Sequence, residues 1–141
     1  MNSLLLLTVF SFFIFLYSLY QTKTKQNPNG LTRFLLPLGI FVWGDGVIFG
    51  LFWFLVGLFL LTTQSSHLFA IIYAIFWIVR SAGEALYWFL QQFSKIQRDP
   101  PHTVPFSSIF AGESVWFAMQ IIWQCVLVIS ITVLLRLLQL L

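Results

Sequence analysis

The chain has 141 residues, of which 60% are hydrophobic, 19% aromatic and only 8% charged. A soluble domain carries roughly 25% charged residues, so this composition excludes a water-soluble globular domain and predicts an integral membrane protein. The formal net charge is only +3, and the basic residues lie in loops or near the ends of apolar runs. The chain therefore offers no basic face that could follow a nucleic-acid backbone, and its length fits one domain.

The first apolar run, residues 4–20, carries no charged side chain. A secretory signal peptide is the alternative, but no basic residue precedes the run and no small-residue cleavage pattern follows it. Tyr17 and Tyr20 at its end suit the aromatic belt of a membrane–water interface. We therefore expect a retained first transmembrane helix over residues 4–20.

The second apolar run, residues 34–61, is too long for one upright helical span. Pro37 suits the first turn of a helix, which predicts a helix over residues 37–62. The run contains glycines spaced seven, four and seven residues apart, namely Gly39, Gly46, Gly50 and Gly57. Such a stripe favours close packing of helix backbones. The alternative is that the glycines flanking Asp45 mark a helix break that frees backbone groups for a ligand, as in some transporters.

The third and fourth helices are predicted over residues 68–93 and 108–136. Ser65 or Ser66 can cap the third helix, and Ser107 or Ser108 can cap the fourth. The four apolar runs together predict an all-α bundle of four transmembrane helices, forming a single domain over residues 1–141.

Lysine and arginine are distributed unevenly over the three predicted loops. The first loop holds Lys23, Lys25 and Arg33, the second holds none, and the third holds Lys95 and Arg98. Because cytoplasmic loops carry an excess of Lys and Arg, this pattern puts the first and third loops in the cytoplasm. Both termini are then expected on the non-cytoplasmic side of the membrane.

Two ionisable residues, Arg80 and Glu84, lie inside the third predicted helix. Their spacing puts them on one helix face, one turn apart, and Tyr87 and Gln91 continue that face. Ionisable groups at membrane depth are rare and costly, so by default they mark a functional site or a buried assembly contact.

Three predicted helices bring polar groups to a similar depth. At about 1.5 Å per residue, Asp45, Glu84 and Gln120 lie roughly 16–18 Å from the cytoplasmic edge. We expect these residues and Arg80 to form a shared mid-membrane site, with Asp45 close enough to hydrogen-bond Arg80. The approach to this site is expected to be lined by Tyr87, Gln91, Glu113 and Gln124.

Two carboxylates beside one certain cation should not both stay ionised in a low dielectric, so one is expected to carry a proton. One hypothesis is structural: Arg80 pairs with one carboxylate, the other is hydrogen-bonded, and the arrangement locks the helices together. The functional hypothesis is that the spare acid binds a proton, a cation or a cationic group of a ligand.

Enzyme chemistry has little support in the sequence. His67 and His102 lie far apart and Cys125 is the single cysteine, so no metal-ligand cluster is expected. Neither a phosphate-binding glycine loop nor a nucleophile motif is present, and no cofactor is expected. Paired carboxylates can still perform acid–base chemistry on a lipid-soluble substrate.

The leading hypothesis is therefore a non-enzymatic multi-pass membrane protein that binds or passes a small cation, proton or solute. The second is an accessory or assembly subunit of a membrane complex, in which the polar stripe is a helix–helix contact. The third is a small lipid-modifying enzyme. The expected partners are the lipid bilayer and either a second copy of the chain or another membrane protein.

Overall fold

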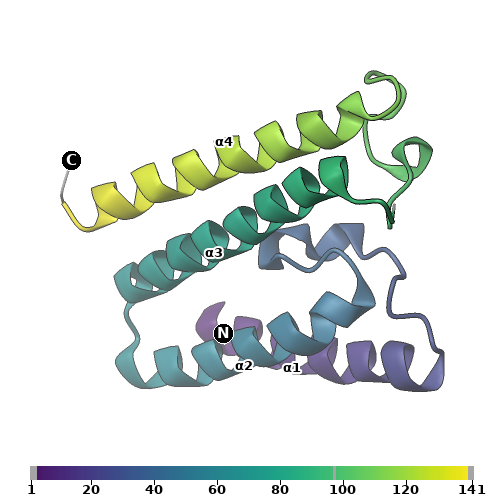
Figure 1. The fold of residues 1–141 in the computed structure, drawn as a ribbon. Coiled ribbons are helices and arrows are strands. Elements are labelled where there is room, and N and C mark those ends of the chain that lie inside the picture. The colour runs from purple at the N-terminus through teal and green to yellow at the C-terminus, as the bar shows by residue number, and fades with distance from the viewer. Residues whose placement is uncertain (1–2, 97, 140–141) are drawn as a thin grey trace. The chain divides into compact units, whose positions relative to one another are not determined.

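The computed structural model describes residues 3–96 and 98–139. It contains four long helices, α1 (Ser3–Leu19), α2 (Trp43–Thr63), α3 (Ser66–Phe93) and α4 (Ser114–Leu137) (Figure 1). A π-helical turn, η1 (Tyr20–Thr24), extends α1, and two short 3₁₀ helices, η2 (Arg33–Leu38) and η3 (Pro101–Thr103), lie in the connections. All four long helices are long and apolar enough to cross a membrane. The predicted all-α class, with four helices of membrane-spanning length, is confirmed for the described part of the chain.

The chain divides into two compact units, residues 1–69 and residues 70–141. The first unit contains α1, α2, the connection between them and the start of α3. The second contains the rest of α3, the following loop and α4. The predicted serine cap of α3 is confirmed, because Ser65 Oγ accepts a hydrogen bond of 3.1 Å from the backbone N–H of Leu68.

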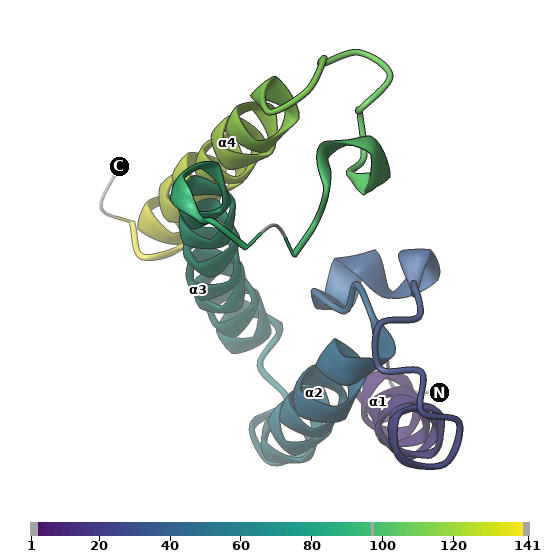
Figure 2. The same ribbon diagram turned by 45° about the vertical axis from the view of Figure 1, so that its right-hand side comes forward.

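In the first unit, α1 and α2 lie side by side (Figure 2). Small residues line the contact between them. A Cβ atom added at Gly50 would lie 2.9 Å from the backbone nitrogen of Phe15, and one added at Gly57 would lie 3.1 Å from the Cα of Thr8. Neither position leaves room for a side chain. The predicted packing role of the glycine stripe is confirmed here and at Gly46, which faces Ser18. Gly39 lies before α2 begins.

The second helix begins later than predicted, at Trp43 instead of residue 37. Pro37 lies inside η2, and Gly39 ends that short helix with a left-handed φ of 71°. The backbone then returns in an extended conformation, and Leu31 pairs with Val42 in an isolated antiparallel bridge. The apolar run is therefore interrupted, and the segment folds back so that Leu35 and Ile40 are buried against Ile14 of α1.

In the second unit, the loop after α3 is folded back onto the facing ends of α3 and α4. Val104 of this loop is buried in a cluster with Trp88 of α3 and Val115, Trp116 and Met119 of α4. The fourth helix begins at Ser114, so the predicted start at residue 108 is wrong. Left-handed φ values at Phe106 (68°) and Gly112 (58°) keep the intervening chain out of a continuous helix.

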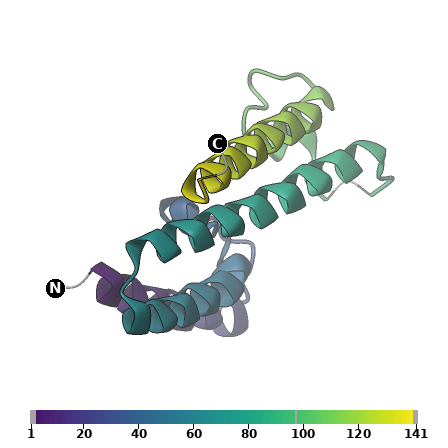
Figure 3. The same cartoon turned by 90° about the vertical axis from the view of Figure 1, so that its left-hand side faces the viewer.

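The α3–α4 pair uses large side chains where the α1–α2 pair uses glycines. The indoles of Trp77 and Trp123 stack with ring centroids 6.4 Å apart and an interplanar angle of 16°. Figure 3 shows the two helices running alongside each other. Aromatic rings, rather than backbone contact, fill the space between them.

Candidate functional site

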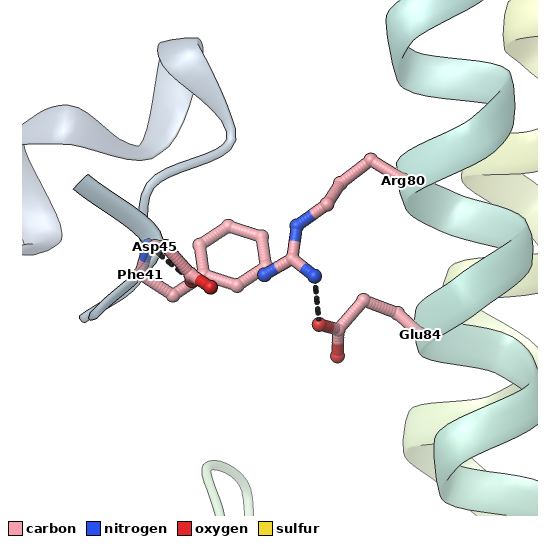
Figure 4. Close-up of polar contacts among 4 residues, drawn as sticks. All are labelled: Phe41, Asp45, Arg80 and Glu84. Atoms are coloured by element: carbon pink, nitrogen blue, oxygen red, sulfur yellow. Dashed lines mark hydrogen bonds and ion pairs between the residues drawn. The ribbon is translucent and has the colours of Figure 1, made fainter. Parts of the chain in front are cut away.

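The ion pair inside α3 is the most unusual feature of an otherwise apolar helix. Arg80 Nη1 lies 2.7 Å from Glu84 Oε1, and each side chain is only 16% exposed (Figure 4). The two residues lie one helical turn apart, which confirms the predicted pairing on one face. The guanidinium and the carboxylate neutralise each other within α3 itself, which lowers the cost of holding both in an apolar segment.

Polar and aromatic residues continue this face along most of α3. They alternate spacings of four and three residues, which keeps them on one side of the helix. We call this set the α3 stripe; it comprises Tyr73, Trp77, Arg80, Glu84, Tyr87 and Gln91. All six side chains are buried or half-buried. This face therefore carries hydrogen-bonding and charged groups along much of a helix of membrane-spanning length.

The loop after α3 supplies a polar group that the sequence did not single out, Asp99. Its Oδ2 accepts a hydrogen bond from the hydroxyl of Tyr87, and its backbone carbonyl accepts one of 2.9 Å from Trp116 Nε1. Asp99 therefore ties the loop to both α3 and α4. The available signal was its position directly before Pro100 and Pro101, a proline pair that stiffens the loop leaving α3.

Gln120 of α4 has a partner in the same unit, Gln92 of α3. Gln92 Nε2 donates to Gln120 Oε1 at 2.7 Å, and also to the backbone carbonyl of Trp88 at 3.2 Å. The predicted depth of Gln120 rested on a helix starting at residue 108. Because α4 starts at Ser114, Gln120 lies near the beginning of that helix.

Two buried polar atoms near the C-terminal end of α3 have no hydrogen-bond partner among the described residues. They are the indole nitrogen of Trp88, a donor, and Oε1 of Gln91, an acceptor. Gln91 is 4% exposed and Trp88 is 7% exposed. Buried polar atoms without a partner are uncommon in folded proteins. These atoms can bind a water molecule or a small polar group at this end of the stripe.

Two residues that were expected to line the approach to the site, Glu113 and Gln124, are exposed instead of being buried with the α3 stripe. Glu113 is exposed at the N-cap position of α4, where its side chain makes no capping hydrogen bond. Gln124 is exposed on α4, beside an open depression that it lines with the apolar residues Ile121, Val128 and Ile129 and with Cys125.

Asp45 lies in the first turn of α2. Its carboxylate accepts a hydrogen bond from the interrupted backbone that precedes this helix. Oδ2 accepts a hydrogen bond of 3.1 Å from the N–H of Phe41 (Figure 4). Thr32 Oγ1 donates to the carbonyl of Ile40 at 3.0 Å, and Trp53 Nε1 donates to that of Leu38 at 2.9 Å. Three side chains thus complete the hydrogen bonds of the break.

The depth predicted for Asp45 counted continuous helix from Arg33, and the structure has no continuous helix between Arg33 and Asp45. The run does contain a break, at residues 39–42, but the two glycines that flank Asp45 lie inside α2, where the alternative interpretation placed the break. The protein's own side chains bond the freed backbone groups of Leu38, Ile40 and Phe41. The prediction that Asp45 shares Arg80 with Glu84 stays a prediction, because Asp45 and Arg80 belong to different compact units.

The chain matches no protein-family model, and no curated protein and no solved structure is significantly similar to it.

Proposed function

We propose that this chain is a multi-pass membrane protein whose α3 stripe binds, or passes, a small cation, a proton or a polar solute. The observation that carries the proposal is the Arg80–Glu84 pair, held in a helix of membrane-spanning length. Ionisable side chains in such helices are costly and commonly line substrate or ion pathways.

The pair suggests how binding occurs. A cation or proton that reaches Glu84 competes with Arg80 for the same carboxylate oxygen. Because like charges repel strongly in a low dielectric, an arriving cation displaces the guanidinium from Glu84. Gln91 Oε1 and the Trp88 indole offer the next acceptor and donor along the helix.

The test is the melting temperature of the detergent-solubilised protein, measured against pH and cation type. For the wild type we expect the melting temperature to change with both. Arg80→Leu leaves Glu84 without its partner, and breaking a buried pair costs about 3–5 kcal/mol in soluble proteins. The double variant Arg80→Leu/Glu84→Leu should recover much of this stability but lose the dependence on pH and cations.

Arg136→Leu is the matched control, because it removes an exposed arginine from the last turn of α4. It should retain the wild-type dependence on pH and cation type. A wild-type melting temperature that is insensitive to both would contradict the proposal.

An accessory or assembly subunit is the second candidate function. The exposed amide of Gln124 on the apolar surface of α4 favours it, because an amide facing lipid lacks hydrogen-bond partners. A second copy of this chain, or another membrane protein, would supply those partners. An insensitive wild-type melting temperature in the test above is the result that this candidate predicts.

A further inference from the structure

The connection between α1 and α2 carries the whole net charge of the chain. Lys23, Lys25 and Arg33 lie in it, and no acidic residue precedes Asp45. The four remaining basic residues are matched in number by the four acidic residues, so the formal net charge of +3 resides in this connection. All three basic side chains are exposed.

Large apolar side chains are exposed beside one of these cations, Arg33. Phe34 is 71% exposed and Leu31 is 68% exposed, on either side of the exposed Arg33. A surface made of basic and apolar side chains together is typical of segments that lie at a membrane–water interface.

The same segment is anchored along the α1–α2 pair. Leu35 and Ile40 are buried against Ile14 of α1, and the carbonyl of Leu38 accepts the hydrogen bond from Trp53 of α2. Figure 1 shows η2 beside the first part of α2. The exposed apolar side chains of this segment therefore lie alongside an apolar helix pair.

We propose that the surface formed by Lys23, Lys25, Leu31, Arg33 and Phe34 binds acidic phospholipid. The three cations contact headgroup phosphates, while Leu31 and Phe34 lie against the acyl chains. Charge complementarity carries the assignment, because anionic lipids attract basic segments next to a membrane span. This inference does not depend on what the α3 stripe binds.

Native mass spectrometry of the full chain in a neutral detergent, titrated with phosphatidylglycerol or phosphatidylcholine, tests the proposal. We expect the wild type to bind phosphatidylglycerol more tightly than phosphatidylcholine. Each basic residue removed should weaken phosphatidylglycerol binding about fivefold, so Lys23→Gln/Lys25→Gln should lose on the order of 25-fold. Its binding of phosphatidylcholine should not change.

The matched control is Lys95→Gln/Arg98→Gln, which removes the same number of exposed charges from the loop after α3. That loop also carries Asp99 and Glu113, so its formal charge is balanced. The control should bind phosphatidylglycerol like the wild type. Equal losses in the two double variants would overturn the proposal, as would a wild type with no preference for phosphatidylglycerol; an acidic partner protein would then be the better occupant.

Discussion

At the scale of single residues, Asp45 shows that a carboxylate in an apolar run can serve the local backbone. Its Oδ2 accepts the N–H of Phe41, a backbone group that a continuous helix would have bonded internally. Thr32 and Trp53 perform the same task for two carbonyl groups of the interrupted segment. The hydrogen bond to Phe41 is sufficient reason for an acceptor at position 45, independent of any ligand.

Replacing Asp45 by alanine should lower the free energy of unfolding by about 1–3 kcal/mol, because the Phe41 N–H loses its acceptor. Asp45→Asn keeps a side-chain oxygen at the same place and should cost less than half as much. Unfolding in mixed detergent micelles, followed by circular dichroism, measures both. Equal losses for the two variants would show that the negative charge, rather than the hydrogen bond, matters at this position.

At the scale of elements, the two helix pairs differ in the size of the side chains between their backbones. The α1–α2 pair brings glycines against the backbone of the facing helix, whereas Trp77 and Trp123 stack between α3 and α4. Small residues permit close approach and many dispersion contacts, which contribute strongly to helix association in lipid. Aromatic rings hold α3 and α4 farther apart, beside the α3 stripe.

A pair of glycine-to-alanine variants tests this difference. Gly50→Ala should destabilise the protein by about 1–3 kcal/mol, because its Cβ would meet the backbone of Phe15, which cannot move aside without shifting α1. Gly83→Ala is the control: a Cβ there meets nothing within 4 Å. Since alanine favours a helix over glycine, it should stabilise α3 by about 0.5–1 kcal/mol. Destabilisation by Gly83→Ala equal to that by Gly50→Ala would contradict this assignment of the packing face.

At the scale of the whole molecule, the charges in the connecting segments predict how the protein is oriented in a membrane. The first connection carries three basic residues, and the two residues between α2 and α3 carry none. The positive-inside rule therefore predicts that the first connection is cytoplasmic, with both termini on the opposite side.

Cysteine labelling in intact cells tests this orientation in a Cys125→Ser background, where no other cysteine competes. A membrane-impermeant thiol reagent should label Ser66→Cys, beside the second connection, and leave Asn29→Cys in the first connection unlabelled. Both positions are exposed. Permeabilised cells provide the control, since both cysteines should then react. The opposite pattern in intact cells would invert the predicted topology.

Local features of this protein follow from the sequence because they depend on residues close together in the chain. The four apolar runs predict the four long helices, and a spacing of four residues predicts the Arg80–Glu84 pair, since one helical turn brings these residues together. The glycine spacing in α2 likewise predicts its packing face, confirmed at three of the four positions.

Tertiary contacts decided where the helices start and which polar groups meet. The break before α2 buries Leu35 and Ile40 against Ile14, and the late start of α4 buries Val104 against Trp88 and Trp116. Asp99 with Tyr87, and Gln92 with Gln120, are likewise pairs separated by at least one loop or turn. No periodicity in the sequence encodes these contacts, because burying distant apolar side chains outweighs the local preference to continue a helix.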